Sequence, residues 1–290
     1  MRLNAYLLAA DPAWIEASVL SYYDWVDRII VSYDQGGRGW SGSPLRLEDC
    51  LARLRAIDSK QKMCFRPGDY ARPGQDPMIA DTHQRHSAFE QAAEGADWVL
   101  QVDTDEVLPN PIRLIDVLGI AAARDIRAVE WPMRILYRKL HRGGYLEICQ
   151  SNGANHFEYP GPIAIRPGCV HVDARRVVGP FLRPVVANDS ASLQVSRPPG
   201  PLEHRIDLPN AQDAIIHNSW ARRPASIRSK VASWGHNQGM KTWAYYHLRW
   251  KPSPLCWKWM RDLHPFARGL WPALKRCDNL PPEILARAVE

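Results

Sequence analysis

The chain has 290 residues, of which 46% are hydrophobic and 23% are charged, and its formal net charge is +6. This composition is ordinary for a soluble globular protein, and the length allows one large domain or two small ones. It has no run of about 18 or more apolar residues, so no transmembrane helix is expected; the N-terminus lacks the features of a signal peptide, so we expect a cytoplasmic protein.

The N-terminal part of the chain alternates between strand-like and helix-like segments. Strands are predicted at residues 3–8, 28–33, 62–66 and 98–102, and helices at residues 12–25, 47–57 and 79–93. Such alternation implies right-handed crossovers and a mostly parallel sheet, in which ligands bind at the carboxyl ends of the strands. Polar clusters follow three of these strands, at Asp34, at residues 68–69 and at residues 103–106.

The pattern changes in the second half of the chain. We predict a helix at residues 111–123 and strand pieces at residues 128–137, 144–148 and 162–165. Glycine and proline interrupt these pieces, which favours a mixed or antiparallel extension of the same sheet. Residues 183–209 are polar and rich in proline, as in a long loop or lid. The segment from residue 224 to the end is predicted to be helical and aromatic.

These patterns predict an α/β protein with a mixed, mostly parallel central sheet flanked by helices. Residues 1–220 would form the α/β domain, and residues 221–290 a basic, tryptophan-rich helical extension packed on it. From His217 to the end there are 13 Lys and Arg against 4 Asp and Glu, together with seven of the twelve tryptophans. This asymmetry indicates an anionic partner, for which a diphosphate, a membrane surface and a nucleic acid are the candidates.

The six cysteines are scattered along the chain and form no C-x-x-C pair. This spacing indicates neither a zinc site nor a dense disulfide framework. We expect reduced, buried thiols, as in a cytoplasmic protein.

The strongest chemical signal is the sequence WVLQVDTDE at residues 98–106. Three acidic side chains leave a strand that is expected to be buried, where ionised carboxylates must be paired or bind a cation. Asp103 and Asp105 would lie on the same side of an extended chain and suit a hard divalent cation, Mn²⁺ or Mg²⁺, that bridges phosphate oxygens. A capped turn is the alternative. The preceding strand, Glu106 and the α/β alternation favour a metal–phosphate site.

The order of these segments resembles that of GT-A glycosyltransferases, in particular bacterial family-2-like enzymes. The resemblance rests on a first strand at residues 3–9, on Asp34 at the end of the second strand, and on Arg85 in a helix. It also rests on residues 96–106, which match a "W-x-x-x-x-D-x-D-E" element. It is good over about residues 1–110 and thin from there to about 210. It returns at the sequence IHNSW (residues 216–220) followed by Lys230.

The resemblance implies a GT-A fold in which residues 1–220 bind a nucleotide sugar, with UDP- or GDP-linked donors favoured. It implies that Asp34 contacts the base or ribose, that Arg85 lies near the nucleotide, and that Asp103 contacts the ribose or the metal. It further implies that Asp105 is the main metal ligand. Two later residues complete the implied set, His217 as a metal ligand and Lys230 as a diphosphate contact.

Each implied role has a structural alternative. Asp34 would instead cap the glycine-rich turn that follows it, and Arg85 would be a solvated helix residue. His217 would be a satisfied structural histidine, and Lys230 one basic residue among many. The first strand ends in Leu-Ala-Ala-Asp, without the short polar motif usual in that family, so the identity of the base stays open.

The sequence selects no catalytic base. An inverting transferase needs a carboxylate that deprotonates the acceptor hydroxyl, and an inverting reaction is favoured here by the resemblance alone. The acidic residues considered are Glu106, Glu130, Glu147, Asp173 and Glu203. No spacing distinguishes among them.

Three functions therefore remain to be compared. The first is transfer of a sugar from a nucleotide diphosphate to a glycan or lipid-linked acceptor, with peripheral contact to an anionic membrane through the basic, tryptophan-rich end. The second is a metal-dependent nucleotidyl or phosphoryl transferase, although no phosphate-binding G-x-x-x-x-G-K-[ST] loop occurs. The third is a protein that binds nucleic acid or another anionic surface without catalysis. The acidic balance before residue 217 argues against nucleic acid.

Overall fold

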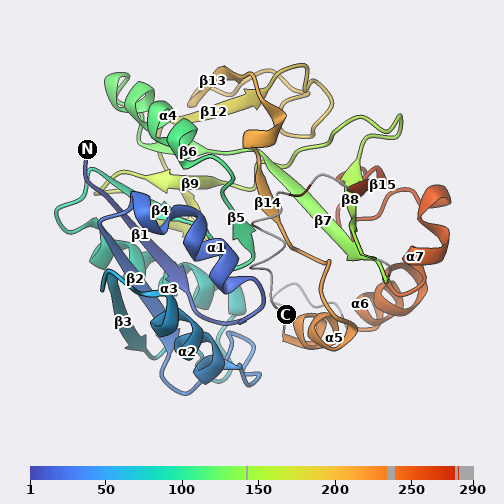
Figure 1. Cartoon of the computed structure of the whole chain (residues 1–290), viewed down its shortest axis with the longest axis horizontal. Helices are drawn as coiled ribbons and strands as arrows, with labels where there is room; N and C mark the ends of the chain where they lie inside the picture. Colours follow the sequence, from blue (N-terminus) through green and yellow to red (C-terminus); the bar gives the residue numbers. More distant parts are fainter. Residues whose placement is uncertain (142, 234–238, 278–279, 281–290) are drawn as a thin grey trace.

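A computed structural model describes residues 1–141, 143–233, 239–277 and 280, without the side chains of residues 229–233. The larger of its sheets has eight strands in this part of the chain, in the order β13-β12-β6-β9-β4-β1-β2-β3 (Figure 1). Its strands are β1 (Leu3–Leu8), β2 (Arg28–Asp34), β3 (Met63–Gly68), β4 (Trp98–Gln101), β6 (Ala128–Glu130), β9 (Pro162–Ile165), β12 (Phe181–Val186) and β13 (Glu203–Leu208). Only β9 runs antiparallel to its neighbours among these described strands, so the prediction of a mixed, mostly parallel sheet is confirmed.

A second sheet has the order β15-β8-β7-β14-β5 within the described residues. Its strands are β5 (Glu106–Val107), β7 (Met133–Lys139), β8 (Tyr145–Cys149), β14 (Ile215–His217) and β15 (Ala273–Cys277). Strands β7 and β14 are parallel, and the other neighbours are antiparallel. A small hairpin of β10 (His171–Asp173) and β11 (Arg176–Val177) completes the strands of the described chain.

Helices α1 to α4 pack on the larger sheet, and α5 to α7 lie in the C-terminal part of the chain (Figure 1). They are α1 (Ile15–Tyr22), α2 (Leu47–Ile57), α3 (Pro77–Ala93), α4 (Pro111–Ala123), α5 (Pro224–Ser233), α6 (Met240–Tyr245) and α7 (Ser253–Cys256). Short helical turns are η1 (Tyr23–Trp25), η2 (Ala211–Asp213), η3 (Tyr246–Trp250) and η4 (Trp257–Trp259).

Alternation along β1 explains why helices cover both faces of the sheet. Side chains along a strand point to opposite faces in turn. Ala5 and Leu7 join a core cluster with residues of α1, α2 and α4, whereas Tyr6 and Leu8 join a cluster with Ala88 and other residues of α3. Strand β1 is buried along its whole length, as a strand covered on both faces must be.

Helix α3 carries Arg85 toward the site, and its ends are defined by local chemistry. The Asp76 side chain accepts hydrogen bonds from the backbone N–H groups of Met78 and Ile79, and Pro77 occupies the first turn. Gly95, with a φ of 68°, follows the helix in the left-handed region that favours glycine. The helix begins at Pro77, two residues before the predicted start at residue 79.

The order of the strands reverses beside β1. The chain runs from β1 to β2 and β3 on one side, and then returns to β4 on the other side of β1. In open α/β sheets, ligands bind at such a reversal, outside the carboxyl ends of the two strands. The carboxyl ends of β1 and β4 are followed by Asp11 and by Asp103 to Glu106, so acidic residues line this position.

The prediction of a loop or lid at residues 183–209 is wrong for its two ends. Strands β12 and β13 lie there and form a parallel pair at the edge of the larger sheet. Its buried charge is neutralised within the sheet: Arg183 of β12 donates to Glu130 of β6 at 2.6 Å and also to Glu203 of β13. A polar edge strand is hard to distinguish from a loop by composition.

The C-terminal extension, predicted to be helical, contains a strand as well as helices. Strand β15 pairs antiparallel with β8 and extends the second sheet, and helices α6 and α7 are short. Residues 281–290 lie outside the described part of the chain. Helix α1 begins at Ile15 rather than at Pro12, because Trp14 has a left-handed backbone with a φ of 66° that interrupts the helix.

Candidate functional site

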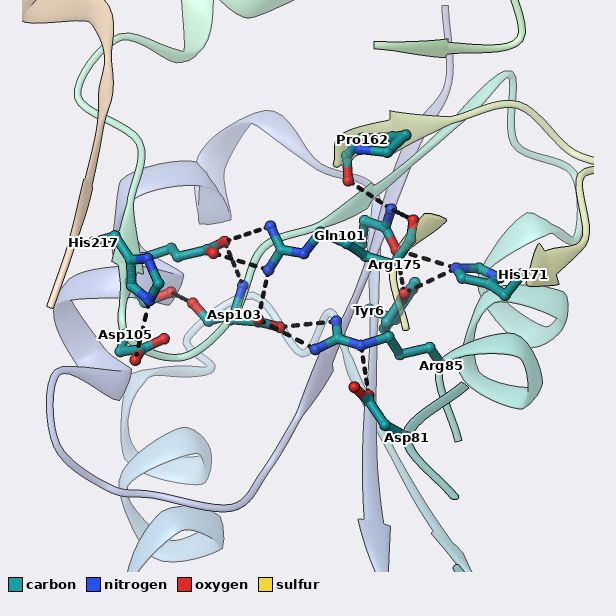
Figure 2. A network of polar contacts seen from close by, with 12 residues as sticks. Tyr6, Asp81, Arg85, Gln101, Asp103, Asp105, Pro162, His171, Arg175 and His217 are labelled. Atoms are coloured by element: carbon teal, nitrogen blue, oxygen red, sulfur yellow. Dashed lines mark hydrogen bonds and ion pairs between the residues drawn. The ribbon is translucent and has the colours of Figure 1, made fainter. Parts of the chain in front are cut away.

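The acidic segment after β4 forms a turn. Strand β4 ends at Gln101, and the N–H of Glu106 donates to the carbonyl of Asp103 at 3.0 Å. The alternation of an extended chain therefore does not apply to Asp103 and Asp105. Figure 2 shows their carboxylates directed toward different partners, with His217 beside Asp105 and Arg85 beside Asp103.

Two buried arginines hold Asp103. The Arg85 guanidinium donates from Nη1 to Oδ1 at 3.0 Å and from Nη2 to Oδ2 at 3.2 Å, a bidentate arrangement. Arg175 donates to Oδ2 at 2.5 Å. The Nε of Arg85 donates at 2.7 Å to Asp81, which lies one helical turn earlier in α3. Arg85 is only 6% exposed, so it is not a solvated helix residue, and its implied place near a nucleotide stays a prediction.

Arg175 also neutralises Glu106, which is almost completely buried. Its Nη2 and Nη1 lie 2.8 and 3.3 Å from the Glu106 carboxylate oxygens, and the N–H of Asp103 donates to the same carboxylate at 3.0 Å. The carbonyl of Arg175 accepts from Gln101 Nε2 at 2.9 Å, which fixes the turn between β10 and β11. Glu106 is therefore a structural member of this network.

The same network shifts the pKa values of its acids in opposite directions. Burial opposes ionisation of Asp103, but Arg175 and Arg85 outweigh it and lower the pKa of its carboxyl below the ordinary value. Burial raises the pKa of Glu106, against the opposing effect of Arg175, and burial likewise raises the pKa of Asp81. Asp103 is thus an anion at neutral pH.

Two buried polar side chains, Tyr6 and His171, hold Gln101 beside this network. Tyr6 Oη donates to Gln101 Oε1 at 2.5 Å, and His171 Nε2 lies 3.1 Å from the same oxygen. Burial, together with Arg85 and His86, lowers the pKa of His171 to about 3, so this imidazole is neutral at physiological pH. Tyr6 and neutral His171 thus orient Gln101 without adding charge, and Gln101 in turn holds the backbone of Arg175.

Asp105 lies on the other side of the turn, next to His217. Strand β5 pairs with β14 so that Glu106 faces His217 in the register, and this brings the preceding residue, Asp105, to the imidazole. The Nε2 atom of His217 is 3.5 Å from Oδ2 of Asp105. Arg222 then donates to Asp105 and to Asp11, so one guanidinium joins the ends of β4 and β1.

Asp105 and His217 fit one divalent cation, and Asp103 does not share it in this arrangement. The distance of 3.5 Å between the two ligand atoms is less than two metal–ligand bonds of about 2.1 Å each, so both can face one ion. Both oxygens of Asp103 accept from guanidinium groups. Oδ2 of Asp105 also accepts from Arg222, so a cation there would compete with that guanidinium for the same oxygen. No three His, Cys, Asp or Glu side chains of the described residues form a metal-binding group, so phosphate and water would supply the other ligands.

Asp34 has the bonds of a loop cap. Its Oδ2 accepts from the N–H groups of Gly36 and Arg38, and its Oδ1 from those of Tyr70 and Ala71, all between 2.9 and 3.2 Å. These bonds join the loops after β2 and β3, as the structural alternative expected. An open groove of about 550 Å³ adjoins this cap and is lined by residues 35–37 and 45–49. The predicted contact of Asp34 with a base or ribose stays a prediction.

Lys230 lies in α5, but its side chain is outside the described residues, so its predicted diphosphate contact stays a prediction.

Apart from Glu106, the acidic residues considered as a base lie elsewhere and are paired. Glu130 and Glu203 both bind Arg183, within the edge of the larger sheet. Glu147 binds Arg134 at 2.6 Å and Lys275 at 3.3 Å in the second sheet. Asp173 forms an exposed pair with Arg176 at 3.6 Å. None of these pairs involves Asp103 or Asp105 among the described residues.

Glu158 is a carboxylate that the sequence did not indicate. Its backbone exchanges two hydrogen bonds with Met133, at 2.8 and 3.0 Å. Met133 also pairs with Ile215, two residues before His217, so Glu158 and His217 lie on the same face of the second sheet. The half-buried Glu158 carboxylate accepts from the indole Nε1 of Trp271, and no Lys or Arg of the described residues pairs with it. Burial raises its pKa.

Sequence reasoning also missed Asp11, Asp81, Arg175 and Arg222. Two signals were available: Asp11 follows the first strand, and Asp81 stands one helical turn before Arg85. Arg222 follows the sequence IHNSW by two residues, but nothing marked it among the basic residues of that region. Arg175 gave no signal, because the hairpin that carries it was not predicted.

No protein-family model and no curated protein matches this chain. In the part that the structure describes, no helix is long and apolar enough to cross a membrane. None of the six cysteines forms a disulfide, and four of them are buried, as expected.

Proposed function

We propose that this chain is a glycosyltransferase of the GT-A fold that moves a sugar from a nucleotide diphosphate to the hydroxyl group of a glycan or lipid-linked acceptor. The observation that carries the proposal is the Asp105–His217 pair, which lies at the strand reversal beside β1. Two ligands for a hard cation at the position where α/β sheets bind nucleotides are what a diphosphate donor requires.

The surrounding charges suit a cation together with a diphosphate. The carboxylates of Asp11, Asp81, Asp103, Asp105 and Glu106 outnumber the guanidinium groups of Arg85, Arg175 and Arg222. Asp105 and His217 would hold Mn²⁺ or Mg²⁺, which neutralises the charge that develops on a departing diphosphate. Arg222, which contacts Asp105 and Asp11, would orient phosphate oxygens by charge-assisted hydrogen bonds when the donor binds.

Glu158 is the acceptor-side base in this proposal. The acceptor hydroxyl oxygen forms a bond to the anomeric carbon, the bond from that carbon to the phosphate oxygen breaks, and its electron pair leaves with the diphosphate. The hydroxyl proton passes to the Glu158 carboxylate, and the configuration is inverted. Burial raises the pKa of Glu158, and its carboxylate accepts from a neutral indole N–H, which suits a group that must take up a proton.

The products of a nucleotide-sugar panel test the proposed reaction. The protein is incubated with Mn²⁺ and UDP-, GDP-, CDP- or dTDP-linked sugars, with and without simple glycoside acceptors, and products are separated by mass. Sugar transfer releases a nucleoside diphosphate. Cleavage of the P–O–P linkage instead releases a nucleoside monophosphate when the sugar-phosphate is transferred, or sugar 1-phosphate when the nucleotidyl group is transferred. Absence of a nucleoside diphosphate with every donor, or appearance of the monophosphate or of sugar 1-phosphate, would overturn the proposal.

A further inference from the structure

The segment from residue 240 to residue 261 has an apolar outer face. Helix α6 continues directly into η3, and their inward side chains, including Thr242, Tyr245 and Trp250, are buried. The outward side chains Met240 and Leu248 are 85% and 73% exposed. Large apolar side chains therefore stand beside Lys241 and Arg249 on the outside, where an ordinary surface helix presents mainly polar side chains to water.

Exposed apolar side chains continue in the sequence beyond η3. Leu255 in α7 is 86% exposed and Trp259 in η4 is 77% exposed. With Met240 and Leu248, they are the four most exposed large apolar side chains of the described residues. Single exposed apolar residues are normal, but their concentration in one segment marks an interaction surface.

All of the charged side chains in this segment are cationic. Residues 240–261 contain no Asp or Glu. Its five cationic side chains are all exposed, and they are Lys241, Arg249, Lys251, Lys258 and Arg261. An apolar face among basic residues is complementary to an anionic lipid surface, where apolar side chains enter the interface and cations meet the head groups.

The segment is firmly attached to the second sheet. Tyr245 Oη donates to the carbonyl of Leu263 at 2.7 Å, and Trp250 Nε1 contacts the carbonyls of Tyr137 and Trp220, each at 3.1 Å. The Arg138 guanidinium lies 3.7 Å from the centre of the Trp250 ring. The exposed apolar face therefore belongs to a packed element. In Figure 1, α6 and α7 lie at the periphery of the molecule.

We propose that residues 240–261 dock the protein on an anionic lipid bilayer. Met240, Leu248, Leu255 and Trp259 enter the interface, and the basic side chains bind the anionic head groups. This inference rests on the exposed surface alone and does not depend on the proposed sugar transfer.

Vesicle co-sedimentation of the full chain tests the docking surface. We expect binding to vesicles of phosphatidylcholine with phosphatidylglycerol, at least tenfold stronger than to phosphatidylcholine alone and weaker as salt is raised. The double variant Leu255→Ser/Trp259→Ser should bind at least tenfold more weakly. The matched control Ile112→Ser/Ile120→Ser changes two exposed apolar residues of α4 and should bind like the unchanged protein.

A charge pair of variants separates the two contributions. Lys251→Glu/Lys258→Glu should lose binding to anionic vesicles, whereas Arg124→Glu/Arg197→Glu, with the same change of charge at exposed sites elsewhere, should lose much less. Circular dichroism verifies that each variant is folded. The proposal fails if the unchanged protein does not bind anionic vesicles, or if the segment variants bind as their controls do. Self-association of the chain through this face, without vesicle binding, also overturns it.

Discussion

The imidazole Nε2 of His217 lies 3.5 Å from Oδ2 of Asp105, although the two residues are far apart in the sequence. The antiparallel pairing of β5 with β14 produces this contact, because it places Glu106 opposite His217. A cation held between these two side chains would meet a nucleotide at the carboxyl ends of β1 and β4.

Asp105→Asn should remove metal-dependent nucleotide binding while the fold survives. Mn²⁺ with a nucleoside diphosphate at about 100 times its Kd should raise the Tm of the unchanged protein by on the order of 5–10 °C, because ligands that bind only the native state stabilise it. The asparagine has the same shape but lacks the charge, so this shift should vanish. Differential scanning fluorimetry checks it. Asp207→Asn, at an exposed position of β13, is the control and should keep the shift; a shift retained by Asp105→Asn would remove its metal role.

His217→Ala should weaken the affinity for Mn²⁺ by about tenfold or more, since even outer partners of metal ligands are worth tenfold to a hundredfold. Isothermal titration with MnCl₂ and a nucleoside diphosphate measures the affinity directly. His204→Ala, which removes an exposed imidazole from β13, should leave it unchanged. Equal affinities of the two variants would return His217 to a structural role.

Glu158→Gln should abolish sugar transfer to a hydroxyl acceptor and leave the binding of donor and Mn²⁺ intact. The amide preserves the shape and still accepts a hydrogen bond from Trp271, but it cannot take up the hydroxyl proton. Azide, an acceptor that carries no proton to remove, should still react with the donor and give a glycosyl azide. Mass spectrometry of the products distinguishes these outcomes. Full transfer to the hydroxyl by Glu158→Gln would exclude it as the base, even if the chain is a glycosyltransferase.

The stability of Glu158→Gln relative to the unchanged protein should rise with pH. Burial raises the pKa of Glu158 in the folded state, so the folded state holds more protons than the unfolded state above the ordinary Glu pKa of about 4.3. Folding of the unchanged protein is therefore penalised increasingly as the pH rises from that value through the folded pKa, and the glutamine does not titrate. Urea unfolding of both proteins between acid and neutral pH measures the difference. A difference independent of pH would contradict the raised pKa.

Local signals in the sequence predicted the elements that position the acidic turn after β4. Strand β1 and helix α2 have the predicted bounds, because apolar periodicity defines both. The meeting of Asp105 and His217 was anticipated only through the family resemblance. The position of Glu158 could not be predicted from the sequence. Glu158 lies outside the regular strands, and a single β-bridge to Met133 fixes its position. Pairings between distant segments leave no local pattern, so the position of Glu158 beside the second sheet had to come from the structure.

Arg175 lies in the turn of the hairpin formed by β10 and β11. Arg175 neutralises Asp103 and Glu106 in the interior, so Arg175→Met should leave buried carboxylates uncompensated and cost about 3–5 kcal/mol of unfolding free energy. Arg176→Met, one residue later, removes an exposed pair with Asp173 and should cost about 0–1 kcal/mol.

Chemical denaturation of the two arginine variants measures both costs. Adding Glu106→Gln to Arg175→Met should restore part of the loss, because the glutamine needs no counter-charge. A loss that the second substitution does not reduce would mean that packing of the long arginine side chain, rather than its charge, holds the acidic turn in place.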